Sequence, residues 1–426
     1  MSVKILLQHV NIISPGSAHH LTEKDILIEA DKIVNIATAG SIKVENAEVI
    51  KGEGLFVSSG WFDLHVNFGE PGEENKEDIQ SGCRAAMQGG FTGVLLMPST
   101  LPPLSSRPAV EFILQKAKNS LVTIQVAGTI SEKREGLELS EMYDMFQAGV
   151  RVFTDDKRAI QDAGLMTRAL LYIQNFKGKI FSFAEDKQLA GKGLVHEGST
   201  STMLGLKGIP SIAEEIMISR DLSLAEYTNS SIHFSTISSG KSVDLIRKAK
   251  AKGIKVTADV SAINLLLDDN SLVGFDTVYK LKPPLRNKND KELLIEGLVD
   301  GTIDSICSDH CPQEVEKKKK EFELAEYGAS GLETAFAVAR TATKNKLSLP
   351  ELISKFTSHP RNCAGLKTGI IENNQPADLT IFYPDHKWLV TGDHIKSKSR
   401  NNPFIGQELT GKAFAVINKG LIEYCK

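Results

Sequence analysis

Four of the short apolar runs in this sequence end in acidic or histidine side chains. In chain order these are Asp63 and His65, Asp155 and Asp156, Glu185 and Asp186, and Asp309 and His310. Carboxylates and imidazoles gathered in one place hold a divalent cation, which polarises a carbonyl group and lowers the pKa of a bound water molecule. The four pairs therefore indicate metal chemistry, provided that the fold brings the ends of these runs together.

Eight apolar runs rich in β-forming residues alternate with amphipathic stretches of helix length. The runs cover 56–66, 93–98, 123–130, 149–155, 179–185, 231–237, 254–260 and 303–309. One intervening stretch runs from Ser239, a suitable N-cap, to Gly253, a suitable C-terminal stop. This alternation predicts an α/β fold of the (β/α)8 TIM-barrel type, in which the carboxyl ends of the strands share one mouth. A doubly wound open sheet is the competing fold, but neither a Gly-rich dinucleotide fingerprint nor a P-loop follows the first run.

The two ends of the chain differ from its middle. Residues 1–54 show the apolar alternation of β-strands, and residues 367–426 are again rich in β-forming segments. We therefore predict three segments: 1–54 as the N-terminal part of a small β-sandwich, 55–366 as the barrel, and 367–426 as the C-terminal part of the same sandwich.

The composition excludes several classes of protein. The 426 residues include 50 basic and 53 acidic side chains, and this balance gives no general field for nucleic acid or an anionic membrane. No apolar run approaches the roughly 20 residues that span a bilayer. The first residues lack the pattern of a secretory signal, and five scattered cysteines form no disulfide framework, so we expect a soluble protein of the reducing cytoplasm. The lysines at 317–320 lie between acidic residues and are expected to form a solvated face.

Within 65–102 the motifs HVNFGEPG, KEDI, GGFT and MPSTLP follow one another, and FTDD (153–156), FAED (183–186), SDHCP (308–312) and ADLTIF (377–382) come later. Nearly from end to end, these motifs resemble those of the dihydroorotase family of the amidohydrolase superfamily. The resemblance implies a metal-dependent (β/α)8 barrel with a β-sandwich built from both termini. It also implies the reversible cyclisation of carbamoyl aspartate to dihydroorotate in pyrimidine synthesis.

Most of the metal ligands that the resemblance implies are replaced. The family's four histidine positions are occupied here by His65, Asn67, Phe183 and Thr236. Neither a phenyl ring nor a threonine hydroxyl replaces imidazole on zinc. The residual ligands are then His65, Asp155 at the family's bridging-carboxylate position, and Asp309 at the position of its catalytic aspartate.

The positions that bind substrate in the family have changed as well. Gly69 stands where an arginine grips the substrate carboxylate, and Ser99 replaces the asparagine of the family's MPNT motif. Lys282 replaces an asparagine and Gln313 a histidine. The glycine that follows the paired aspartates in the family is Lys157 here.

We therefore expect a chain that keeps the dihydroorotase fold but does not hydrolyse dihydroorotate by itself, because the Lewis acid and the anion clamp are lost together. Without metal, water with a pKa of about 15.7 is a poor nucleophile. The family includes non-catalytic chains that help to assemble aspartate transcarbamoylase, so the resemblance implies this partner and a homodimer. The replaced ligands lead us to expect no cofactor. Neither a nucleic acid nor a membrane is expected as a partner.

The alternative is an active dihydroorotase, or another cyclic-amide hydrolase, with one zinc ion on His65, Asp155 and Asp309, for which Asn67 is a candidate fourth donor. Asp309 would then act as general acid and base. Lys157 and Lys282 would shape a changed substrate pocket.

Two structural interpretations stand beside these. His65 and Asp309 could persist only as hydrogen-bonded residues of the barrel mouth, and His233 is expected to be a satisfied core histidine. If the mouth is otherwise intact, the three substitutions Asn67→His, Phe183→His and Thr236→His are expected to restore metal binding.

Overall fold

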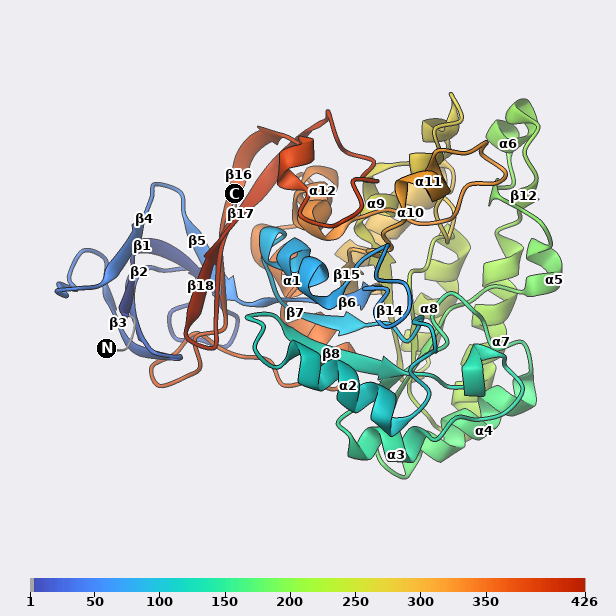
Figure 1. The fold of residues 1–426 in the computed structure, drawn as a ribbon, viewed down its shortest axis with the longest axis horizontal. Coiled ribbons are helices and arrows are strands. Elements are labelled where there is room, and N and C mark those ends of the chain that lie inside the picture. The colour runs from blue at the N-terminus through green and yellow to red at the C-terminus, as the bar shows by residue number, and fades with distance from the viewer. Residues whose placement is uncertain (1–3, 426) are drawn as a thin grey trace.

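The computed structural model describes residues 4–425 and contains two large β-sheets (Figure 1). One is a parallel sheet of eight strands in which each strand neighbours the one before it in the barrel. Its strands are β6 (Trp61–Val66), β7 (Phe91–Leu96), β8 (Thr123–Gly128), β9 (Val152–Phe153), β10 (Lys179–Ser182), β13 (Ile232–Phe234), β14 (Val256–Ser261) and β15 (Ser305–Cys307). Each overlaps one of the eight predicted runs, so the predicted barrel is confirmed.

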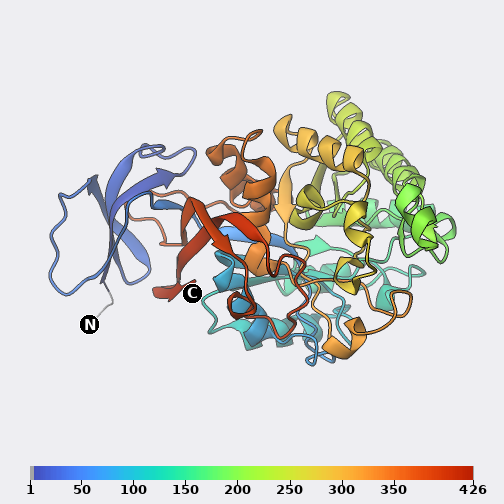
Figure 2. The ribbon, with the colours of Figure 1, turned by 90° about the horizontal axis from the view of Figure 1, so that it is seen from above.

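The α-helices alternate with the strands and flank the barrel (Figure 1, Figure 2). They are α1 (Ile79–Gln88), α2 (Arg107–Ala117), α3 (Met142–Gln147), α4 (Ala163–Gln174), α5 (Lys187–Ala190), α6 (Ser199–Leu204), α7 (Ile212–Thr228), α8 (Gly240–Ala251), α9 (Ala262–Leu266), α10 (Lys288–Val299), α11 (Val315–Lys318), α12 (Ala335–Thr343), α13 (Leu349–Ser354) and α14 (Ser358–Cys363). The short strands β11 (Val195–His196) and β12 (Gly208–Ile209) pair with each other. Within residues 4–425, no helix is long and apolar enough to cross a membrane.

The barrel is nearly closed where its first strand meets its last. A parallel bridge joins β6 to His310, and the N–H of Asn67 donates to the carbonyl of His310 at 2.8 Å. The carboxylate of Asp63 accepts the N–H groups of His65 and Ser308, each at 2.8 Å. Burial raises the pKa of Asp63 to about 6, although these hydrogen bonds oppose the rise. The ends of β6 and β15 are thereby held side by side.

Both ends of the chain contribute to the second sheet, as predicted. Its strands are β1 (Lys4–Ile13), β2 (Glu23–Glu29), β3 (Lys32–Thr38), β4 (Glu48–Lys51), β5 (Phe56–Ser59), β16 (Leu379–Leu389), β17 (Glu408–Asn418) and β18 (Leu421–Tyr424). Strand β5 lies between β1, to which it is parallel, and β16, to which it is antiparallel. In both ribbon views this sheet lies at one side of the barrel (Figure 1, Figure 2).

The first predicted run, 56–66, is two strands and not one. Its first part, β5, belongs to the terminal sheet, and its second part, β6, belongs to the barrel. Gly60 separates them, and a Cβ atom there would overlap Thr92 and Asp378. The chain therefore enters the barrel at Gly60. The sequence does not reveal this break, because both parts are apolar and buried.

The lysines at 317–320 are not all solvated, contrary to the prediction. Lys318 is only 6% exposed, and its Nζ donates to the carbonyls of Glu326 at 2.9 Å and Gly328 at 3.0 Å. Burial lowers the pKa of Lys318 to about 8. The loop that follows β15 is thus fastened from inside by an ammonium group.

Candidate functional site

The polar side chains at the barrel mouth come from strand ends with an unusual backbone. Asp156, Thr236 and Asp309 follow β9, β13 and β15, and their φ angles are +55°, +51° and +51°. Residues with side chains rarely adopt this left-handed region, and such strained residues cluster at functional sites. Three strand ends at the mouth therefore share a backbone conformation that is common at functional sites.

His65 faces two carboxylates across the mouth. Its Nε2 lies 2.8 Å from Asp156 Oδ1 and 3.7 Å from Asp309 Oδ1, and the imidazole is 2% exposed. Burial raises the pKa of Asp156, but the imidazole and the guanidinium of Arg134 outweigh it and hold that pKa well below its usual range. Asp156 is therefore an ionised carboxylate in a buried place.

Two residues that replace family residues, Asn67 and Ser99, donate hydrogen bonds to Asp156. The side-chain amide of Asn67 donates to Asp156 Oδ2 at 3.0 Å, and the hydroxyl of Ser99 donates to the same oxygen. Together the two donors use both lone pairs of that oxygen, so an additional ligand would have to compete with one of them. Asn67 and Ser99 thus act here as hydrogen-bond donors to a carboxylate.

The structure places Asp156, and not the predicted Asp155, beside the imidazole. The carboxylate of Asp155 accepts the N–H groups of Ile130 at 2.9 Å and Ser131 at 3.0 Å, and also the Ser131 hydroxyl. The positive φ of Asp156 turns the second aspartate of the pair into the mouth. The guanidinium of Arg134, which donates to the carbonyl of Asp155, lies 3.8 Å from Asp156 Oδ2.

Lys157 reaches into the centre of this group. Its Nζ lies 2.7 Å from Asp309 Oδ1 and 3.1 Å from the hydroxyl oxygen of Thr236, and it is 5.4 Å from the ring centroid of Phe183. Burial lowers the pKa of Lys157, but the carboxylates of Asp309 and Asp156 raise it further, above its ordinary value. The ammonium is therefore charged and sits among residues at family ligand positions.

A second lysine approaches the same ring. Lys282 Nζ is 5.7 Å from the ring centroid of Phe183 and forms an ion pair with Glu185 Oε1 at 2.7 Å. Asp186 has a structural role, because its carboxylate caps α5 by accepting two backbone N–H groups. Of the two acidic residues that end the fifth strand, Glu185 therefore pairs with a lysine and Asp186 caps a helix.

At two further positions where the resemblance implies substrate contacts, Gly69 and Gln313 contact loops of this chain. Gly69 has a φ of +47°, and a Cβ atom there would overlap the carbonyls of Glu73 and Glu77. An arginine cannot occupy this position unless the loop moves. Gln313 is 6% exposed, and its side-chain amide donates to the carbonyl of Tyr327 at 2.8 Å. It therefore holds a loop.

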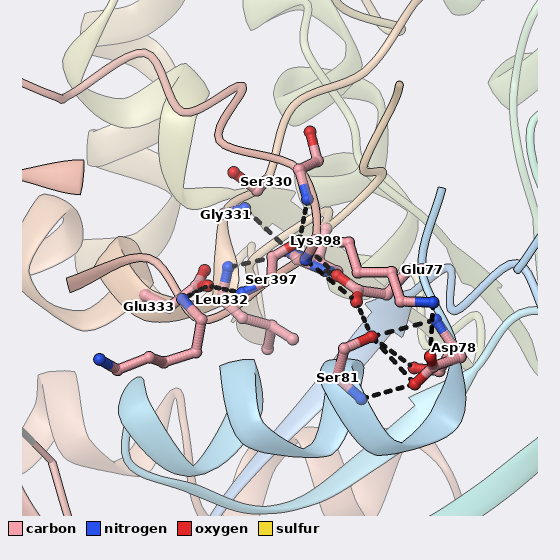
Figure 3. A network of polar contacts seen from close by, with 12 residues as sticks. Glu77, Asp78, Ser81, Ser330, Gly331, Leu332, Glu333, Ser397 and Lys398 are labelled. Atoms are coloured by element: carbon pink, nitrogen blue, oxygen red, sulfur yellow. Dashed lines mark hydrogen bonds and ion pairs between the residues drawn. The ribbon is translucent and has the colours of Figure 1, made fainter. Parts of the chain in front are cut away.

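A buried network supports the mouth from one side (Figure 3). Glu77 is fully buried and accepts the hydroxyls of Ser81 and Ser397 and the N–H of Lys398, the last at 3.3 Å. His310 Nε2 lies 3.5 Å from Glu77 Oε2. Burial raises the pKa of Glu77, but His310 and the two hydroxyls lower it more, to below its ordinary value. The carboxylate joins the start of α1 to the loop between β16 and β17.

The same loop is fastened a second time. Glu333 Oε1 accepts the N–H groups of Lys396 at 3.0 Å and Ser397 at 2.9 Å, and burial raises the pKa of Glu333 (Figure 3). His310 Nδ1 accepts the N–H of Gly331 at 3.2 Å. The end of β15 therefore contacts the segment that carries Glu333, and this segment is bonded to the loop between β16 and β17.

His233 lies in the core and has partners on both ring nitrogens, as its neighbours in sequence predict. Nδ1 is 2.8 Å from Thr257 Oγ1, Nε2 is 2.8 Å from Asp259 Oδ2, and the ring stacks on Phe181. Burial by itself lowers the pKa of His233, but the hydrogen bond to Asp259 raises it more, to about 9.

This raised pKa predicts a pH dependence of stability. An unfolded histidine has a pKa of about 6.5, so the contribution of His233 is fully present below that pH and is lost as the pH rises through about 9. We expect the free energy of unfolding to fall by about 2 kcal/mol between about pH 7 and about pH 9. Urea titrations at several pH values measure it. A His233→Gln variant should lack this decline, and an equally steep decline in the variant would contradict the assignment.

A cavity of about 510 Å³ opens at the mouth, lined by Asn67, Ser99, Asp156, Lys157, Lys282 and Asp309 among others. Its size suits a small molecule. Across residues 4–425, no group of three or more His, Cys, Asp or Glu side chains is arranged to hold a metal ion. With an ammonium on Asp309, and with a ring and a hydroxyl beside it, the donors do not fit the zinc site that the family implies.

The barrel and the sheet built from both termini are those of an amidohydrolase. A model described as "Amidohydrolase family" matches residues 196–421, and one described as "Dihydro-orotase-like" matches residues 54–242. Among solved structures, L-hydantoinase (dihydropyrimidinase) from Arthrobacter aurescens is similar with a TM-score of 0.85 and 24% identity, covering 99% of this chain and 96% of that one. Dihydropyrimidinase from Brevibacillus agri is similar with a TM-score of 0.83 and 20% identity, covering 99% and 95%.

Curated relatives define the family more narrowly. A dihydroorotase of Pelotomaculum thermopropionicum is 41% identical over 423 residues, which are 99% of this chain and 98% of the relative. A dihydroorotase of Syntrophotalea carbinolica is 40% identical over 425 residues, which are 99% of each chain. The chain therefore belongs to the dihydroorotase family.

Two residues of the mouth have roles that the sequence did not reveal. Arg134 comes from a loop with no motif of its own. The sequence shows Lys157 as a replacement for glycine, but it does not show the ion pair of this lysine with Asp309. One signal in the sequence points to the contacts of Lys157: a lysine is gained at one strand end where histidines are lost at two others, Phe183 and Thr236.

Proposed function

We propose that this chain is a dihydroorotase-like protein of pyrimidine synthesis that does not itself interconvert carbamoyl aspartate and dihydroorotate. Its role is that of a structural partner of aspartate transcarbamoylase, in the cytoplasm and as a homodimer. The fold and the family are retained, whereas the positions that hold metal and substrate in the family serve other contacts in this chain.

One observation carries the proposal. The Nζ of Lys157 lies 2.7 Å from Asp309, the residue at the family's catalytic position. The ammonium occupies a carboxylate oxygen that a substrate or a metal ion would otherwise contact. Asp309 is thereby engaged by a side chain of the protein itself, and no arginine stands at Gly69 to hold a substrate carboxylate.

The catalytic part of the proposal is tested with full-length protein purified without chelator. We expect no dihydroorotate hydrolysis above the blank and no stoichiometric zinc by elemental analysis. The matched control is Asp309→Asn, because turnover that survives this change comes from a contaminating enzyme. Turnover by the unchanged chain, with zinc bound and with loss of activity in Asp309→Asn, would overturn the proposal.

The partner role needs a separate experiment. The chain is co-expressed with aspartate transcarbamoylase of the same organism, and the mixture is analysed by size-exclusion chromatography with light scattering. We expect a common peak of higher mass than either protein and a change in transcarbamoylase activity. Separate elution with unchanged activity would remove this part of the proposal.

A hydrolase with one metal ion is the second candidate. It is favoured by the position of His65 Nε2, which lies 2.8 Å from Asp156 and 3.7 Å from Asp309, while Nδ1 has no hydrogen-bond partner within the described residues. Zinc binding with turnover in the first experiment would support this candidate.

A further inference from the structure

We infer that the ammonium group of Lys157 replaces a divalent cation in the barrel mouth, as a covalently attached counter-ion that also excludes metal. This inference deepens the proposed function but concerns only the chain's own residues. It needs neither a partner nor a substrate.

The first step is the electrostatic demand of the mouth. Asp156 is 4% exposed and Asp309 is 11% exposed, and both lie within 4 Å of the same imidazole nitrogen. Two carboxylates removed from water at such short separation require a positive charge nearby. In a metalloenzyme a bound cation meets that demand.

The second step is that Lys157 meets the demand from within the chain. Its ammonium is paired with Asp309 at 2.7 Å, and the side chain is 16% exposed. It follows Asp156 directly in sequence, so one strand end carries both a carboxylate and the cation. The cation is therefore present in every folded molecule, at no cost in translational entropy.

The third step concerns what surrounds the ammonium. Thr236 offers it a hydroxyl oxygen at 3.1 Å, and Phe183 offers the face of a ring at 5.4 Å. Both suit an ammonium, since a hydroxyl accepts its N–H and a ring attracts its charge. These are two of the three positions at which the family's histidines are missing. Loss of the histidines and gain of the lysine therefore form one coordinated replacement.

The three histidine substitutions alone are therefore not expected to restore metal binding. Imidazole donors are supplied by Asn67→His, Phe183→His and Thr236→His. The side chain of Lys157 nevertheless still lies between these positions and remains paired with the carboxylate of Asp309. Only removal of this side chain, by Lys157→Gly, frees Asp309 for a metal ion.

Zinc titration by calorimetry, with elemental analysis after dialysis, separates the possibilities. Four proteins are compared: the unchanged chain, Lys157→Gly, the triple histidine variant, and the quadruple variant that combines them. We expect stoichiometric zinc only in the quadruple variant, with binding at least about 100-fold tighter than in the triple variant. Equal affinity in the triple and quadruple variants, or no zinc in a folded quadruple variant, would overturn the inference. Stoichiometric zinc in the unchanged chain would also overturn the inference, and dihydroorotate turnover by that chain would in addition defeat the proposed function.

A second measurement needs no metal and no multiple variant. Lys157→Gly leaves a space shaped for an alkylammonium, so n-butylammonium chloride should raise its melting temperature by a few degrees more than it does for the unchanged chain, and n-butanol should not. The matched control is Arg158→Gly at the exposed neighbouring position. An equal response of both glycine variants would contradict a specific cation site.

Discussion

Replacing Lys157 by methionine should lower the free energy of unfolding by about 3–5 kcal/mol, the usual cost of removing one partner from a buried ion pair. Methionine fills a similar volume, so the loss arises from charge and not from a cavity. The carboxylate of Asp309 would remain 11% exposed without its partner at 2.7 Å. Urea denaturation followed by circular dichroism measures the change.

A double-mutant cycle isolates the charge. Asp309→Asn removes the carboxylate, so the double variant Lys157→Met with Asp309→Asn should be more stable than Lys157→Met alone. Replacement of a whole buried pair by neutral groups is often close to neutral. If the effects of the two substitutions simply add, the ion pair does not stabilise the mouth.

Replacing Glu77 by alanine should cost about 3–4 kcal/mol, because several buried donors lose their acceptor at once. The hydroxyls of Ser81 and Ser397 and the N–H of Lys398 all point to this carboxylate (Figure 3). His310 Nε2 also lies 3.5 Å from it. Thermal unfolding measures the loss. Hydrogen exchange should also show faster opening of the loop at 395–402.

Glu74→Ala is the matched control. This glutamate lies in the same loop as Glu77, between β6 and α1, but its side chain is exposed. We expect it to change the free energy of unfolding by less than about 1 kcal/mol. Similar losses in both variants would mean that the buried network does not position the loop.

The barrel could be predicted from the sequence because its eight strands are buried, apolar and evenly interrupted by helices. The break at Gly60 could not, because it depends on the close approach of Thr92 and Asp378 from distant parts of the chain. Burial of Lys318 is hidden for a similar reason, since its ammonium donates to backbone carbonyls that no local pattern reveals.

At the site, the residue types were predicted and their orientations were not. The motif with Asp155 and Asp156 placed a carboxylate at the mouth, but which of the two points inward depends on the φ of Asp156. Lys157 was recognised as a change from glycine, yet only the three-dimensional arrangement brings its ammonium onto Asp309. Contacts between strand ends are set by the curvature of the barrel and not by spacing in the sequence.

The position of β5 between β1 and β16 has a consequence for biosynthesis. The ribosome finishes β5 at residue 59 and begins β16 at residue 379, about 320 residues later. At about 5–20 residues per second, the new edge strand waits roughly a quarter of a minute to one minute for its neighbour. Throughout that interval its N–H and C=O groups can pair with any other extended chain. Nascent chains of this protein are therefore expected to need protection by chaperones until their last tenth has been made.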